Sequence, residues 1–163
     1  MTFIKYAYIV FIGVLFATFV GVGIAAFYKG PISPDYPASL SVPRSISTSS
    51  AQLQDQIVLQ EKYNKESKSY QKAQETYDRN VSIISVIIAI IVLVSTLYLL
   101  KQIPVIADGL LLGAVLTLIY SIIRGFSSGD DAFRFFVVTI GLIVSLILGY
   151  IKFIQPNESN KVK

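Results

Sequence analysis

Cysteine and histidine are both absent from this sequence of 163 residues. Without cysteine the chain can form no disulfide, thiol nucleophile or thiolate metal site. Without histidine it lacks the usual general base at neutral pH, the Ser-His-Asp arrangement and histidine-ligated zinc. These absences argue against an enzyme, and we expect neither a cofactor nor a metal site.

Charge is also scarce, since only 15% of the residues are charged while 53% are hydrophobic. The mean hydropathy of +0.63 is too high for an ordinary soluble domain of this length. The net charge is +4, but no basic block interleaved with aromatic residues is present, so nucleic-acid binding is not expected. The composition indicates a membrane protein, with the lipid bilayer as its first partner.

Four apolar runs, at residues 6–28, 81–100, 104–123 and 132–154, are long enough to cross a bilayer. The hydrocarbon core is about 30 Å thick and needs roughly 20 helical residues. The first run could instead be a cleaved signal peptide, but its apolar core exceeds the typical ~7–15 residues, which favours an uncleaved anchor. We therefore predict an all-α integral membrane protein with four transmembrane helices.

The second span continues a long polar segment. Residues 51–80 contain no glycine or proline, and no helix breaker separates them from the uncharged run that follows. We predict one helix whose polar half projects roughly 45 Å from the membrane, at ~1.5 Å per residue. The chain then divides into a first transmembrane helix (1–28), a Pro/Ser-rich linker (29–50), an extramembrane helix (51–80), a three-span hairpin bundle (81–154) and a polar tail (155–163).

The linker and the polar half each carry a repeat. Prolines at 31, 34 and 37 have the period of polyproline II, which favours a stiff spacer over a docking motif. Tyr63, Tyr70 and Tyr77 recur every seven residues and form a half-apolar seam with Leu59. This seam predicts a contact with a second copy or another protein; the alternative is that the tyrosines pack only locally.

Small residues recur every four positions in three of the spans, which is typical of close helix packing in lipid. We predict packing contacts at Gly13, Ala17, Gly21 and Ala25 in the first span, at Gly109 and Gly113 in the third, and at Gly141, Ser145 and Gly149 in the fourth.

Asp108 is the only carboxylate inside a span. An intramembrane acid suggests a proton relay, a cation ligand or a salt bridge. It lies one turn after Pro104, however, near the interface, where the helix dipole favours negative charge and anchoring is the simpler role. In the turn at 124–131, Asp130 or Asp131 is expected to cap the last helix and to form a salt bridge with arginine.

Four spans place both termini on one side of the membrane. The density of lysines on that side favours a cytoplasmic location, although the total number of basic residues is larger on the other side. The sequence favours a non-catalytic multi-pass protein of the cell membrane, a scaffold or accessory subunit acting through its protruding helix. The alternative is a small transporter or channel that uses Asp108, with Thr117, Tyr120 and Ser121 further along the path.

Overall fold

The computed structural model describes residues 2–37, 50–99 and 102–150, and within these ranges all regular structure is helical. The helices are α1 (Thr2–Phe27), α2 (Ser50–Leu99), α3 (Pro104–Phe126) and α4 (Asp131–Gly149). All four are long and apolar enough, by length and composition, to cross a membrane. The predictions of an all-helical fold and of four such helices are therefore confirmed, while the polar tail at 155–163 lies outside the described residues.

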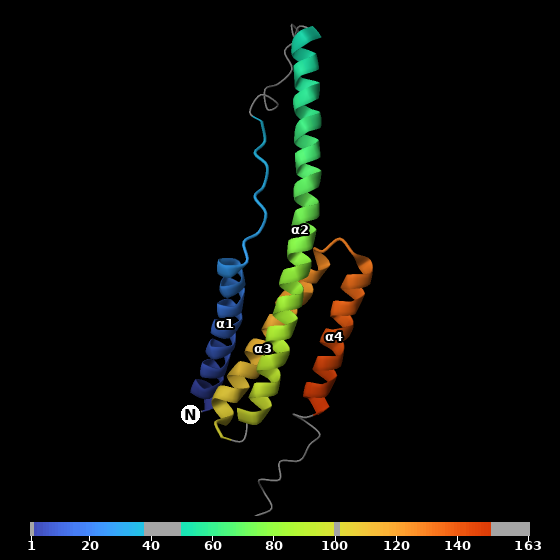
Figure 1. Ribbon diagram of the computed structural model, residues 1–163. Coiled ribbons are helices and arrows are strands. Elements are labelled where there is room, and N and C mark those ends of the chain that lie inside the picture. Colours follow the sequence, from blue (N-terminus) through green and yellow to red (C-terminus); the bar gives the residue numbers. More distant parts are fainter. Residues whose placement is uncertain (1, 38–49, 100–101, 151–163) are drawn as a thin grey trace, which may run out of the picture.

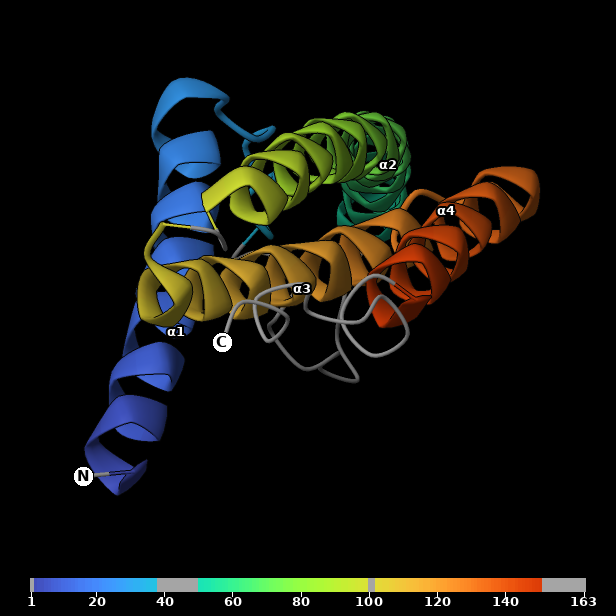
Figure 2. The ribbon, with the colours of Figure 1, turned by 90° about the horizontal axis from the view of Figure 1, so that it is seen from below.

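The four helices run alternately up and down, with α3 at the centre (Figures 1 and 2). Helix α3 packs most extensively against α2 and α1 and less against α4, and α2 barely touches α4. The arrangement is therefore built around one helix rather than being an evenly packed four-helix bundle. Much of the outer surface of α1 and α4 is exposed and apolar, for example at Phe3, Phe11, Phe135 and Leu146. Such a surface suits lipid better than water.

Helix α2 is a single uninterrupted helix of 50 residues. At ~1.5 Å per residue it is about 75 Å long, well over twice the hydrocarbon thickness of a bilayer. Figure 1 shows its first half extending beyond the ends of the other helices, accompanied only by the segment that follows α1. The sequence explains this continuity, because residues 50–99 contain neither glycine nor proline.

Two apolar clusters hold the helices together. One joins α2 and α3 through Ala89, Leu93, Ala114 and Leu118. The other joins α1 to α2 through Val20, Ile24 and Val81, with Tyr120 of α3 beside it. The buried members are alanine, valine, leucine and isoleucine, and the two alanines lie where α2 and α3 meet.

Candidate functional site

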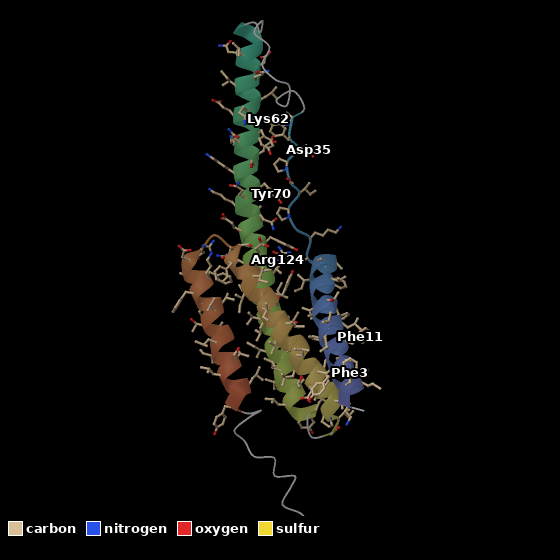
Figure 3. The ribbon with its side chains drawn as sticks, turned by 180° about the vertical axis from the view of Figure 1, so that it is seen from behind. Phe3, Phe11, Asp35, Lys62, Tyr70 and Arg124 are labelled. Atoms are coloured by element: carbon tan, nitrogen blue, oxygen red, sulfur yellow. The ribbon has the colours of Figure 1, made fainter. Side chains whose placement is uncertain are left out.

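Polar side chains from three elements gather where the polar half of α2 meets its apolar half. The end of α1 and the end of α3 reach the same level, and Arg124 lies at this junction in Figure 3. We call this group the collar. Its members, which are linked by the contacts described below, are Tyr28, Gln74, Tyr77, Asp78, Asn80, Tyr120 and Arg124.

The collar is centred on an ion pair. Arg124 donates from Nη1 to Oδ1 of Asp78 across 2.6 Å, and Gln74 donates to the other carboxylate oxygen across 3.2 Å. The side chain of Asp78 is only 4% exposed, whereas that of Arg124 is 33% exposed. A buried carboxylate is tolerated when it is paired and hydrogen-bonded. Both oxygens of Asp78 are engaged, so the pair ties α2 to the end of α3.

Two tyrosines surround the guanidinium group of Arg124. Its Nε donates to the hydroxyl of Tyr120 across 3.2 Å. Its Cζ lies 5.6 Å from the ring centre of Tyr120 and 5.8 Å from that of Tyr77. Both distances are within the range of cation–π attraction. The rings also restrict the arginine to one orientation, which favours a fixed joint between α2 and α3.

Tyr28, just after α1, attaches that helix to the collar. The rings of Tyr28 and Tyr77 stack with centres 5.2 Å apart and planes 2° from parallel. Tyr77 donates its hydroxyl to the carbonyl of Tyr28 across 3.2 Å, and Asn80 donates to the hydroxyl of Tyr28 across 2.8 Å. Three interactions on one residue fix where the chain leaves α1 and turns along α2.

About one turn below the pair of Asp78 and Arg124, Ser82 and Ser121 join α2 and α3 reciprocally. Ser82 donates to the carbonyl of Ser121 across 2.9 Å, and Ser121 donates to the carbonyl of Ser82 across 2.8 Å. Gly125 makes room for this contact, since a Cβ there would lie 3.2 Å from the Ser82 hydroxyl oxygen. Both serines are fully buried, so these bonds are shielded from water and from lipid headgroups.

Two residues of the predicted partner seam contact the segment that follows α1. The ring of Tyr36 meets that of Tyr63 edge to face, with centres 5.1 Å apart, and Tyr77 is stacked on Tyr28. Tyr70 is half-buried, and so is Leu59. Figure 3 shows the segment that carries Asp35 running beside the part of α2 that carries Lys62 and Tyr70. Local packing thus describes Tyr63 and Tyr77, and the contact with a second copy or another protein stays a prediction.

The small residues predicted to pack behave differently on different helices. A Cβ on Gly109 would lie 2.8 Å from Ile12, and one on Gly113 would lie 2.9 Å from Phe16. A Cβ on Gly13 would lie 2.9 Å from Leu112. Ala17 is half-buried, but Ala25 is exposed. A Cβ on Gly21 would meet nothing within 4 Å.

The helical repeat explains this difference. A step of four residues turns about 40° past a full turn, so a strict four-residue stripe drifts around the helix. On α1 the contacting face instead follows Gly13, Phe16, Val20 and Ile24. On α3 the two predicted glycines are one step of four apart, so they drift by only about 40° and both meet α1.

The same drift applies to α4. Gly141 is buried, and a Cβ there would lie 3.1 Å from Ile122. Ser145 is exposed, and a Cβ on Gly149 would meet nothing within 4 Å. Of the predicted packing positions on α4, the structure brings only Gly141 close to α3.

Asp108 is half-buried on the second turn of α3, next to the glycine that meets α1. The polar residues expected to continue a path from it serve helix contacts instead. Thr117 donates to the carbonyl of Gly113 across 2.8 Å, Tyr120 is bonded to Arg124, and Ser121 is paired with Ser82. Within the described ranges, no three acidic groups come together as metal ligands. The transport alternative stays a prediction, which these contacts do not test.

The turn between α3 and α4 follows its prediction. Asp130 caps α4 by accepting from the backbone N–H of Ala132 at 2.9 Å, and Arg134 pairs with Asp131 at 2.7 Å. Gly129 adopts a positive φ of 71°, and a Cβ there would lie 2.7 Å from the carboxyl carbon of Glu75. Glycine is needed both for the backbone conformation and for the space beside α2.

Comparisons of the chain with protein-family models, curated proteins and solved structures give no match. The collar was not predicted from the sequence, although a simple signal was present. Asp78 lies 21 residues before the end of α2 and Arg124 lies 20 residues after the start of α3. In an antiparallel hairpin, equal distances from the connection place two residues at the same level.

Proposed function

We propose that this protein is a non-catalytic, multi-pass protein of the cell membrane that displays a rigid rod. The rod is the polar half of α2, residues 50–80, and it projects from the membrane on the side opposite both termini. The termini are cytoplasmic in this proposal. The rod contacts another protein, so the chain acts as a scaffold or accessory subunit.

The observation that carries this proposal is the collar at the base of the rod. A helix that only connected two spans would need no ion pair, stacked rings and serine pair where it leaves the bundle. Those contacts hold α2 at a defined height against α1 and α3. A rod fixed in this way presents its side chains in a constant position, which reduces the entropy lost when a partner binds.

The surface of the rod favours a protein partner over a chemical reaction. On the side away from the tyrosines, four exposed basic residues outnumber the two exposed acidic residues Glu61 and Glu75; the basic ones are Lys65, Lys68, Lys72 and Arg79. This face therefore carries a net positive charge, which can attract an acidic surface on a partner.

Photo-crosslinking in membranes of cells that produce the protein tests this proposal. A photoreactive residue at Lys68 or Lys72 should give a defined adduct with one protein. A matched residue at Ile119, which is exposed on α3 within its apolar span, should give lipid adducts instead. If positions along the whole rod yield no more protein adducts than Ile119 does, the scaffold role is wrong.

A further inference from the structure

The segment from Lys29 to Pro37 lies along the rod, and we call it the strap. Its register is fixed at both ends. Near the collar, a Cβ on Gly30 would lie 3.5 Å from the ring of Tyr77, and further along Tyr36 meets Tyr63. The strap therefore runs antiparallel to α2 over the whole tyrosine repeat.

The repeats of the two elements have nearly equal lengths. Three residues of polyproline II rise about 9.3 Å, and seven residues of an α-helix rise about 10.5 Å. From Gly30 to Tyr36 a polyproline II chain covers about 19 Å, and from Tyr63 to Tyr77 the helix covers about 21 Å. One proline can therefore accompany each interval between tyrosines.

Burial along the strap has the same period. Pro31, Pro34 and Pro37 are half-buried, whereas the residues between them are exposed, including Ile32 at 94%. The prolines thus form the less exposed side of the strap, while Tyr36, although 52% exposed, reaches Tyr63.

We propose that the strap is an intramolecular mask, and that the tyrosine seam beneath it is the surface through which two copies of the rod pair once the strap leaves. This inference rests on the proposed function and adds its regulation. Seven-residue spacing suits a parallel helix pair, in which equivalent side chains meet. The ion pair between Asp78 and Arg124 sets the height of each rod on its bundle. Two copies in one bilayer therefore present Tyr63 and Tyr70 at matching levels, while Tyr77 stays stacked on Tyr28 in the collar.

The first test asks whether the strap lies on the rod. The chain has no cysteine, so spin labels can be placed at Ser33→Cys and Gln71→Cys alone, in the full chain in nanodiscs. We expect a narrow distance distribution that broadens when Pro31, Pro34 and Pro37 are changed to serine. The control Ile32→Ser/Asp35→Ser changes exposed positions of the same segment and should leave the distribution narrow. A broad distribution in the starting chain, or no broadening in the proline variant, overturns the proposal.

The second test asks whether the strap masks self-association. Ser67→Cys lies beside the seam and Lys72→Cys lies on the opposite face, so disulfide-linked dimers can be compared at the two positions. Loss of the three prolines should raise the dimer yield several-fold at position 67 and leave it unchanged at position 72. Equal yields at both positions, or no rise at position 67, overturn the mask.

The two proposals fail separately. If the photoreactive residue at Lys68 forms adducts with the strap intact, but loss of the three prolines does not raise the dimer yield, the scaffold is supported and the mask is rejected. If the dimer yield rises but no adduct with a partner forms, the mask is supported and contact with another protein is rejected.

Discussion

At the scale of single residues, the two members of the central ion pair are unequally buried. Asp78 is almost enclosed, while a third of the Arg124 side chain is exposed. Removing the partner of a buried charge costs more than removing the pair, because the remaining charge stays desolvated. The two single substitutions are therefore expected to differ.

We predict that Arg124→Leu destabilises the protein by about 3–5 kcal/mol, the range for an orphaned buried charge. Asp78→Leu should cost less, because Arg124 can turn toward water or lipid headgroups. The double variant should be more stable than Arg124→Leu alone. Unfolding in detergent micelles measures all three, and a double variant less stable than Arg124→Leu would show that the pair is not the main interaction of Asp78.

Glycines on α1 and α3 provide a second comparison. A Cβ on Gly113 would lie 2.9 Å from Phe16 and 3.1 Å from the carbonyl oxygen of Gly13, and a backbone atom cannot move aside as a side-chain end can. We predict that Gly113→Ala costs about 1–3 kcal/mol through overpacking. The matched control is Gly23→Ala, where a Cβ meets nothing within 4 Å. That change should be neutral or stabilise by up to about 1 kcal/mol, and an equal loss at both positions would contradict the packing argument.

At the scale of elements, composition and breakers predicted the helices well, because an apolar run of about 20 residues without interior proline has few alternatives to a helix in a bilayer. The prediction of which faces touch was less successful. Gly13, Gly109 and Gly113 lie at contacts, but Gly21 and Ala25 do not. Small residues mark where helices can approach, whereas the crossing of the helices decides where they do. That crossing depends on long-range packing, which a local period does not contain.

The serine pair between α2 and α3 gives a prediction at this scale. Ser82→Ala removes one interhelical hydrogen bond and leaves the carbonyl of Ser121 without that donor. Interhelical bonds in membranes contribute about 0.6 kcal/mol on average and up to about 1.7. We expect a loss near the upper value, since both serines are fully buried. Ser95→Ala is the control, because Ser95 is exposed and bonds only to its own helix. Comparable losses in the two variants would mean that the pair does not hold the helices together.

At the scale of the whole molecule, the alternation of α2, α3 and α4 follows from the short connections between their apolar runs. The collar has a different origin, because the end of α1, the middle of α2 and the end of α3 must lie at the same level. No single stretch of sequence contains that information. The common level becomes apparent only when the length of α2 after Asp78 is compared with the length of α3 before Arg124.

The same comparison gives the last prediction, which concerns sidedness. If α2 and α3 form a spanning hairpin, the rod and the connection at Gln102 lie on opposite sides of the membrane. An impermeant maleimide added to sealed vesicles should therefore label Asn64→Cys from one side and Gln102→Cys only from the other. Both positions are exposed, and the chain contains no other cysteine to react. Arg79→Cys, at the base of the rod, should follow Asn64→Cys. Labelling of Asn64→Cys and Gln102→Cys from the same side would mean that the apolar half of α2 does not cross the bilayer, and the rod would then lose the anchor on which its rigidity depends.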